Sequence, residues 1–438
     1  MGVLYQLDGR KGEVRVFIKE WLAWQANSGQ ANSKNILEDI SECVKEPRQR
    51  KKELKICLKD KIKYSLRECS ASDKYREALK KIHCLARWAF HLDAIGTGKD
   101  PVMELYCELY RGEANASVGE NRLYESLQNM GVIPKLYKED LSRLPAGSFF
   151  ISFKFRLRKP YISRDDTEFY VIDNPVKKDW VFKVPYIASS QWKGCLRTAM
   201  VRQLVDWWTS LQSEDQKKKQ DEFIKRRLQL VRLFGNEQEV DMNSTELEAY
   251  LDRAGGDELA KEYRKKLKEL YGASRQQRDV HRRGRLMFYP TFFSSIGLEV
   301  INPHSRKTGA GERPVYFETV PEGETGRFLL LYVPFDRVGK DPTGTIREIA
   351  EDLRKVAEGV VFLLTGFGFG AKTSSSFGLA RSELCDGEEG KIVVSVPGKE
   401  PKEEGFAVLD FEKDNGLVKR ASELAGGLLG QEVAGGDC

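Results

Sequence analysis

The sequence predicts an α+β fold in which an antiparallel sheet carries two helices on one face, with an all-helical region before it. Three observations lead to this prediction. Helical apolar spacing dominates the first ~145 residues, and strand-like alternation begins at 148–157 with SFFISFKFRL. Strand and helix patterns then follow one another along the rest of the chain. A four-stranded sheet of this RRM type leaves its second face open, and such proteins bind RNA there.

Residues 1–145 are predicted to form a helical domain. The stretch 74–92 places Leu79, Ile82 and Leu85 on one helical face. Residues 45–87 contain 15 basic and 6 acidic side chains, although the net charge of the whole chain is only +6. Two interpretations are open: a bundle with a solvated charged surface, and a bundle whose basic face binds a phosphate backbone. The local excess of positive charge favours the second.

Residues 146–400 are predicted to form the α+β core, followed by an acidic tail at 401–438. The tail is inferred because residues 382–438 contain 13 acidic and 6 basic side chains. The expected core elements, in order, are strands at 148–157 and 168–172, a helix at 191–211 capped by serines, a helical insertion at about 212–278, a strand at 284–289, an excursion at about 291–318, a strand at 328–333, a helix that starts with a capping box of Thr345 and Glu348, and a strand at 392–396.

Composition excludes several classes of protein. Hydrophobic residues make up 40% of the chain and charged residues 32%, which is typical of folded soluble domains, and no apolar run approaches the ~20 residues that cross a bilayer. The first residues have no signal-peptide core, so we expect a cytoplasmic protein. The eight cysteines contain no CxxC pair, which favours reduced thiols over structural zinc, and the four histidines are too separated to indicate a metal site.

The segment 366–378, GFGFGAKTSSSFG, carries the clearest binding chemistry. Ala371 separates the lysine from the last glycine, so the register of a nucleotide-binding P-loop fails and no nucleotide cofactor is expected. Glycines let a phosphate backbone approach amide N–H groups, a lysine neutralises its charge, and hydroxyls add donors. The predicted phosphate contacts are Gly366, Gly368, Gly370, Lys372, Thr373, Ser374 and Ser375, with the two phenylalanines placed to stack on bases. The alternative is a flexible turn with core phenylalanines.

The start of the helix at 191–211 is a second candidate anion site. Ser189 and Ser190 supply hydroxyls, and Lys193 and Arg197 lie four residues apart on one side of its first two turns. The helix dipole and the N–H groups of the first turn favour an anion at this position. An ordinary capped helix is the alternative.

The remaining candidates lie on predicted loops and strand ends. Asp173 in IDNPV is displayed on a turn, where a lone aspartate more often stabilises the turn than performs catalysis. Arg282 and Arg283 precede a strand, and His304 follows an Asn-Pro pair. We include these two arginines and His304 among the candidate RNA contacts. A histidine-based acid–base pair needs two partners that are close in space, which positions along the chain do not establish.

Six segments, taken in order, resemble the RAMP superfamily of CRISPR-associated proteins, and they look most like the RNA-binding backbone subunits of type III effector complexes. These segments are IDNPV at 172–176, PYIASSQWKGCLR at 185–197, LFG at 233–235, GRLMFY at 284–289, residues 299–323, and the glycine segment at 366–378. The resemblance implies a modified ferredoxin-like, RRM-like core over about 148–382. It also implies a guide RNA (crRNA) held by the segments 189–197 and 366–378, and a thumb-like hairpin within 291–318.

The resemblance bears on catalysis as well. In catalytic subunits the aspartate at this motif position supports metal-dependent cleavage of target RNA, which makes Asp173 the candidate catalytic residue, with Mg²⁺ implied only if the chain cleaves RNA. The sequence departs from the family pattern at Ile187-Ala188, where Pro-Gly is usual, and at 161–163, where a histidine is often seen. The segment 300–304 resembles end-capping, non-cleaving subunits.

Three functions are therefore open: a guide-RNA-binding subunit that also cleaves target RNA, a non-catalytic capping subunit, and a repeat-RNA-processing endoribonuclease that would use His281 or His304. The implied partners are guide RNA, target RNA and the other subunits of a CRISPR complex used in antiviral defence, with no membrane.

Overall fold

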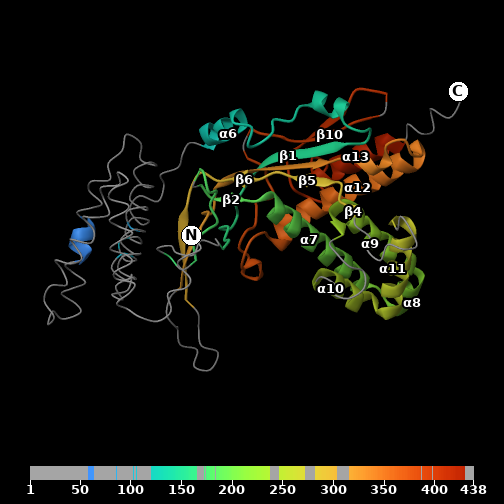
Figure 1. Cartoon of the computed structure of the whole chain (residues 1–438), viewed down its shortest axis with the longest axis horizontal. Helices are drawn as coiled ribbons and strands as arrows, with labels where there is room; N and C mark the ends of the chain where they lie inside the picture. The colour runs from blue at the N-terminus through green and yellow to red at the C-terminus, as the bar shows by residue number, and fades with distance from the viewer. Residues whose placement is uncertain are drawn as a thin grey trace, which may run out of the picture. The chain divides into compact units, whose positions relative to one another are not determined.

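Figure 1 shows the computed structural model of the chain. It describes residues 58–63, 85, 102, 105, 120–164, 172, 174–182, 184–236, 246–271, 282–302, 315–385, 387–396 and 398–429. The chain divides into two compact units, one made of 120–162, 179–293 and 321–438 and the other of 1–119, 163–178 and 294–320. Most of the predicted helical domain lies outside the described residues. Within them, 58–63 are helical, α6 spans Glu120–Asn129, and a 3₁₀ helix spans Lys138–Arg143.

A five-stranded antiparallel sheet, rather than the expected four strands, forms the centre of the larger unit. The strand order is β11–β10–β1–β9–β5, with β1 at Phe149–Arg156, β5 at Leu286–Phe288, β9 at Thr325–Tyr332, β10 at Gly390–Val394 and β11 at Lys402–Phe406. β1 is the middle strand, and its Phe149 lies opposite Val394 on one side and Tyr332 on the other. The predicted strand at 148–157 is thus the centre of the sheet.

One face of this sheet packs against helices α7 (Ser189–Ser210) and α12 (Pro342–Phe362). The ring of Phe149 stacks on Tyr332 with centroids 4.4 Å apart. The indole of Trp192, on α7, meets Phe155 at 6.2 Å and Phe328 at 5.1 Å, both edge to face. Because each of these rings is less than 2% exposed, the aromatic layer fixes the first turns of α7 against the sheet.

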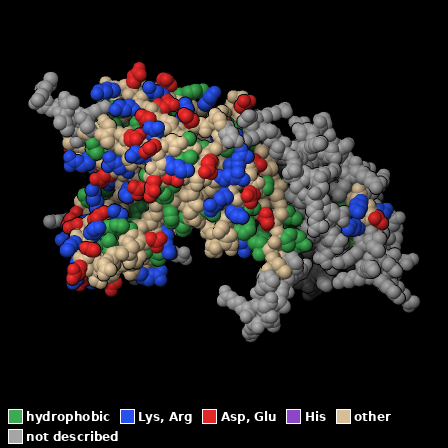
Figure 2. All heavy atoms as spheres, turned by 180° about the vertical axis from the view of Figure 1, so that it is seen from behind, with side chains coloured by type: hydrophobic (Ala, Val, Ile, Leu, Met, Phe, Trp, Pro, Cys, Tyr) green, Lys and Arg blue, Asp and Glu red, His purple; other side chains and the backbone are tan. Residues whose placement is uncertain are grey.

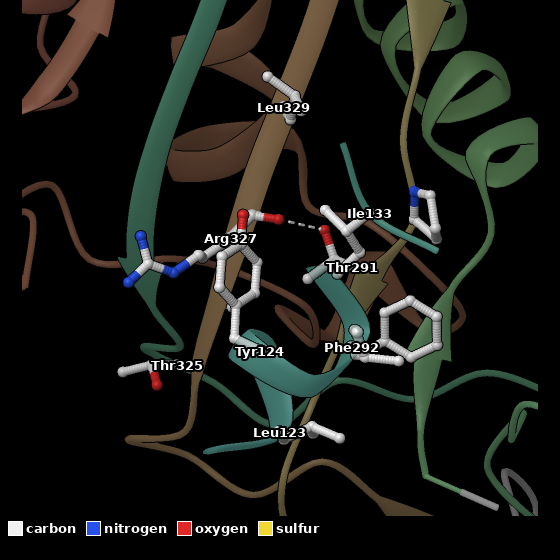
Figure 3. Close-up of a pocket in the computed structure, with 11 residues that line it drawn as sticks. Leu123, Tyr124, Ile133, Thr291, Phe292, Thr325, Arg327 and Leu329 are labelled. Atoms are coloured by element: carbon white, nitrogen blue, oxygen red, sulfur yellow. Dashed lines mark hydrogen bonds between the residues drawn. The ribbon is translucent and has the colours of Figure 1, made fainter. Parts of the chain in front are cut away.

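The opposite face of the sheet is covered in part, which corrects the expectation of a fully open RRM-type face, whereas Lys391 of β10 and Glu403 of β11 are exposed on it. Leu141 of the 3₁₀ helix packs with Phe150, Leu329, Leu331, Val333 and Val393 in a buried cluster. Farther along the same face, α6 lies over β9 and encloses a small pocket, where the guanidinium of Arg327 lies 4.4 Å from the ring of Tyr124 (Figure 3). RNA could stack on the covered part of this face only if the 3₁₀ helix and α6 moved away.

Four helices occupy most of the predicted insertion: α8 (Ser213–Lys218), α9 (Gln220–Phe234), α10 (Glu246–Gly255) and α11 (Asp257–Tyr271). They pack against the second half of α7, where the ring of Trp208 lies 4.5 Å from that of Phe223. The indole N–H of Trp208 also donates to the carbonyl of Ala254 at 3.0 Å. After the insertion, β4 (Arg282–Arg283) pairs with β3 (Gly235–Asn236), and β6 (Thr291–Phe292) pairs with β2 (Tyr186–Ile187).

The start of α12 differs from the prediction. The helix begins at Pro342, and the carboxylate of Asp341 caps it by accepting hydrogen bonds from the N–H groups of Thr343 and Gly344. The prediction that Thr345 and Glu348 form a capping box is therefore wrong. The carboxylate of Glu348 is instead held by several arginines, since it takes part in a buried ionic network between α12 and its neighbours.

The predicted acidic tail is also corrected over 402–429. β11 forms the edge of the sheet, and α13 (Leu417–Leu429) packs on α12 with Leu417 and Ala421 fully buried. The sequence of β11, KEEGF, carries charges because an edge strand needs only part of one face buried. Its composition therefore resembles that of a tail.

The smaller unit contains a β-hairpin within the predicted thumb region. Strands β7 (Gly297–Ile301) and β8 (Val315–Thr319) pair in antiparallel register. The segment after residue 173 runs along β8, where the N–H of Glu318 donates to the carbonyl of Asn174 at 3.0 Å. Among the described residues, no helix is both long and apolar enough to cross a membrane.

Candidate nucleic-acid interface

Helix α7 begins at Ser189, so both predicted serines lie inside its first turn. Ala188 occupies the N-cap in extended conformation and has no side-chain group that caps the helix, which corrects the prediction that the serines act as the cap. The first N–H groups of a helix have no carbonyl partner within it, and the dipole makes this end positive. Ser190 and Gly194 are exposed and Lys193 is partly exposed, so the helix start is accessible to an anion.

The glycine segment follows α12 through a π-helical turn at Leu363–Phe367. Its backbone then enters left-handed conformations, with φ of 85° at Gly368, 93° at Gly370 and 67° at Gly378. Lys372 adopts a left-handed conformation as well, at φ 57°, which a non-glycine residue seldom does. Lys372, Ser374 and Ser375 are exposed on this loop. Strain at an exposed lysine indicates a constrained loop.

Backbone hydrogen bonds hold the loop in place. The N–H of Ala371 donates to the carbonyl of Ile162 at 2.7 Å, and the N–H of Gly378 donates to that of Pro160 at 2.8 Å. Across the loop, the N–H of Phe369 donates to the carbonyl of Gly378 at 2.9 Å. The glycine segment is therefore fixed to the chain that leaves β1, rather than being the flexible turn of the alternative interpretation.

The structure brings the two predicted segments together. The ring of Phe369 lies 4.9 Å from that of Trp192 in the first turn of α7, and 5.7 Å from that of Tyr161. The backbone N–H of Gly370 hydrogen-bonds the thiol of Cys195, whose pKa is nevertheless raised by burial. Residues 366–378 and 189–197 thus meet in one cluster of aromatic rings. We refer to the two segments together as the loop–helix interface.

Phe369 cannot stack on an RNA base, because its side chain is fully buried in this cluster of aromatic rings. Phe367 is partly buried and lies 5.9 Å from Phe362. The prediction that both phenylalanines stack on RNA is therefore wrong for Phe369, whose ring holds the loop on α7. No sequence pattern distinguishes a buried from an exposed phenylalanine between glycines.

The predicted cations differ in their surroundings. The side chain of Arg197 is 12% exposed, and its guanidinium lies 3.9 Å from the carboxylate of Glu248. Arg282 donates to Asp336 at 2.6 Å and stacks on the ring of Tyr271, whereas Arg283 is exposed. Charges of both signs lie among one another over the face drawn in Figure 2. Lys193 and Lys372 are therefore better candidates for phosphate contact than Arg197 or Arg282.

Two residues that the sequence analysis did not assign complete the interface. The hydroxyl of Tyr161, a buried residue after β1, exchanges hydrogen bonds with the side-chain amide of Gln191 at 2.8 and 3.1 Å. This contact joins the end of β1 to the first turn of α7. A tyrosine and a glutamine 30 residues apart give no local signal, so only the fold shows that they meet.

Three predicted residues lie outside the described part of the chain, namely Asp173, His281 and His304. The segment directly after Asp173 is described. The side-chain amide of Asn174 donates to the carbonyl of Tyr316 at 3.1 Å, and the N–H of Val176 donates to the buried carboxylate of Glu318 at 3.2 Å. Burial raises the pKa of Glu318 to about 8, and the ammonium of Lys178 pairs with it. This segment is thus bonded to β8.

Comparison with known proteins gives the family. The model of the RAMP superfamily matches residues 94–381, which is more than half of the chain and contains both segments of the loop–helix interface. The chain belongs to the RAMP superfamily. No curated protein matches its sequence significantly.

Solved structures similar to this RAMP protein include a chain of the "Type III-B Cmr-beta bound to cognate target RNA", with 14% identity over 81% of this chain and 100% of that one, and a TM-score of 0.38. Cmr6 from Pyrococcus furiosus is 18% identical over 53% of this chain and 97% of that one, with a TM-score of 0.25. A chain of a "CRISPR RNA-guided surveillance complex" is 13% identical over 57% and 71%, with a TM-score of 0.30.

Proposed function

We propose that this RAMP protein binds the guide RNA of a type III CRISPR ribonucleoprotein through the loop–helix interface. The observation that carries the proposal is the contact between Phe369 and Trp192, which joins a glycine-rich backbone loop to a helix start. The helix start offers N–H groups and a positive dipole, and the loop offers an exposed lysine and hydroxyls. Membership of the RAMP superfamily supports the CRISPR setting.

Salt-dependent RNA binding tests this proposal. Removing one lysine that neutralises a phosphate of single-stranded RNA lowers the slope of log K against log salt by about 0.7. The double variant Lys193→Ala/Lys372→Ala should therefore bind guide RNA more weakly, with a slope lower by about 1.4. Lys217→Ala/Lys218→Ala removes two exposed lysines from α8 and serves as the matched control. Equal slopes for both double variants would remove the loop–helix interface from the proposal.

The setting of the protein follows from the same proposal. It would act in the cytoplasm in antiviral defence, with guide RNA, target RNA and other CRISPR subunits as partners. A non-catalytic capping subunit would use the loop–helix interface in the same way, and only its position in the complex would differ. A repeat-RNA-processing endoribonuclease would release RNA of a defined processed length. The length of RNA that copurifies with the chain separates processing from guide binding.

Cleavage of target RNA through Asp173 stays a prediction. Among the described residues, no group of three His, Cys, Asp or Glu side chains is placed to hold a metal ion, and Asp173 lies outside them. The test is an assembled complex with Asp173→Ala, compared with wild type for target cleavage in Mg²⁺ and in a chelator. Unchanged cleavage by the variant would remove the nuclease assignment and favour the capping function.

A further inference from the structure

A groove between α7, α9 and α12 lies in the larger unit, beside the chain that enters the glycine segment. Its volume is about 450 Å³, which is within the range of small-molecule sites. Each of the three helices contributes side chains to its lining, which include Gln203 and Trp207 of α7, Arg226 and Gln229 of α9, and Phe362 of α12. We refer to it as the three-helix groove.

Polar groups without a hydrogen-bond partner line this groove. Gln229 is only 8% exposed, and its Nε2 donates to the buried carboxylate of Asp352 at 2.8 Å. The Oε1 atom of the same amide accepts no hydrogen bond from the described part of the chain, and it is not sealed from solvent. The amide of Gln203 and the indole N–H of Trp207 also have no hydrogen-bond partner among the described residues. Because nearly all buried polar groups are paired, the unused oxygen of Gln229 indicates a donor from outside the chain.

Flat π surfaces lie on two walls of the groove. The rings of Trp207 and Phe362 are both partly exposed. The guanidinium of Arg226 lies over the ring of Trp207, with its Cζ atom 3.8 Å from the ring centroid. Bases of single-stranded RNA stack on aromatic rings and on arginine guanidinium planes. The groove thus combines stacking surfaces with unused donors and acceptors, and these two features together recognise a nucleobase.

The charges at the groove are balanced. Its lining contains two cations and two carboxylates, namely Arg226, Lys355, Asp206 and Glu358. The ammonium of Lys355 lies 2.6 Å from the carboxylate of Glu358, and Arg226 pairs with Glu222. Because the cations are neutralised in this way, the groove suits a neutral flat group better than the phosphates of a free nucleotide.

The groove adjoins the loop–helix interface. The ring of Phe362 lies 5.9 Å from that of Phe367, which belongs to the glycine segment. At the other wall, α7 and α12 pack so closely that a Cβ atom at Gly359 would lie 2.6 Å from Cγ of Met200, which also lines the groove. Met200 follows the segment 189–197 on the same helix. A strand whose phosphates contact both segments is therefore within reach of the groove.

We propose that the three-helix groove binds one unpaired base of the RNA strand held at the loop–helix interface. The base stacks on the flat surfaces of Phe362 and of the Trp207–Arg226 pair. Its edge donates to Oε1 of Gln229 and bonds to the amide of Gln203. All four bases have a π face and a donor on their edge, so this contact is not restricted to one sequence. The inference rests on the proposed RNA-binding function and adds a base contact, which the phosphate contacts of the glycine segment do not supply.

Two substitutions in the full chain test the groove, with a fluorescein-labelled single-stranded RNA as the probe. Phe362→Leu removes a stacking surface and should weaken binding roughly tenfold. Gln203→Leu removes a contact with the base edge and should weaken binding roughly fivefold. Gln212→Leu, at an exposed glutamine outside the groove, is the matched control and should bind like wild type. The salt slope should stay the same in every variant, since the phosphate-binding side chains remain in place.

A second set of probes distinguishes a base contact from a disturbed glycine loop. On RNA of the same length that carries abasic sites, wild type and variants should bind equally, because no base is left to enter the groove. RNA that contains 4-thiouridine should crosslink on irradiation to peptides with Trp207 or Phe362, as identified by mass spectrometry. If Phe362→Leu weakens the binding of intact and abasic RNA equally, the ring acts only through Phe367 and the inference is overturned.

The other outcomes separate this inference from the function on which it rests. If wild type does not bind RNA, both fail. If wild type binds RNA and the Phe362→Leu and Gln203→Leu proteins bind it as tightly, the base contact is wrong and the proposed function remains. If these two variants bind RNA normally but lose affinity for AMP, GMP, CMP or UMP, the groove takes free nucleotides and the inference is overturned. It is overturned as well if they bind RNA normally but lose a copurifying CRISPR subunit, since the groove is then a protein contact.

Discussion

Replacing Gly370 with alanine tests whether the backbone geometry of the glycine loop is essential. Gly370 has a φ of +93°, a conformation that L side chains rarely adopt. A Cβ atom at this position would lie 2.4 Å from the carbonyl oxygen of Ile162 and 2.6 Å from the ring of Tyr161. Neither neighbour can yield easily, because the oxygen belongs to the backbone and the ring is buried.

The expected cost combines two effects. Backbone strain of a non-glycine residue at positive φ costs about 1–3 kcal/mol. Overpacking against fixed neighbours costs about 1–3 kcal/mol more. Gly370→Ala should therefore lower the free energy of unfolding by about 2–6 kcal/mol, or open the loop and lose RNA affinity if the loop moves away from Ile162.

Gly366→Ala is the matched control. A Cβ at Gly366 would meet the ring of Phe362 at 3.5 Å, which is ordinary contact, and the residue lies in a helical turn. Alanine should leave stability unchanged or raise it by up to about 1 kcal/mol. Urea unfolding followed by tryptophan fluorescence measures both variants, and RNA affinity is measured in parallel. A Gly370→Ala protein with the unfolding midpoint and RNA affinity of wild type would refute the argument.

Three further predictions concern acidic residues of α12 and its N-cap. Asp352→Ala should lower the free energy of unfolding in urea by about 3–5 kcal/mol, because the fully buried carboxylate binds the buried Arg232. Glu351→Ala breaks a surface ion pair and should cost less than about 1 kcal/mol. Equal costs for the two variants would contradict the role of Asp352 as a buried ion-pair partner. The pKa of Glu348 is held at about 2, below the usual 4.5. Burial alone would raise this pKa, but the hydrogen bond from Arg337 and the nearby arginine charges lower it more. Its stabilisation is therefore present above pH ~4.5 and lost as the pH falls through about 2, and Glu348→Gln should flatten the pH dependence of stability in that window by up to about 3 kcal/mol; an unchanged acid profile would argue against it. Asp341→Ala should lower stability by about 1 kcal/mol through loss of the helix cap, and Asp341→Asn should restore most of it when measured by thermal unfolding.

The sequence predicts well those features that depend on neighbours along the chain. Alternation in SFFISFKFRL predicts β1, and the apolar period after residue 189 predicts α7 to within a few residues. Where the local signal is ambiguous the prediction fails, as at the start of α12. Thr345 and Glu348 match a capping box, yet Asp341, four residues before Thr345, caps the helix, and Pro342 is its first residue.

The candidate site divides in the same way. Glycine content, hydroxyls and lysines predict that the segments 189–197 and 366–378 bind a phosphate backbone, since these properties are local. Which cation is accessible depends on distant partners: Arg282 meets Asp336, 54 residues away, and Arg197 meets Glu248.

By itself the sequence determined the α+β class, the family resemblance and the two segments that meet in the loop–helix interface, because periodicity and motif composition act over a few residues. Only the tertiary structure decided that part of the second sheet face is covered as well, that 402–429 belong to the core, and that Phe369 joins the loop to α7. These features depend on contacts between residues far apart in the chain, whose free energy appears only when the sheet has formed and water has left its faces.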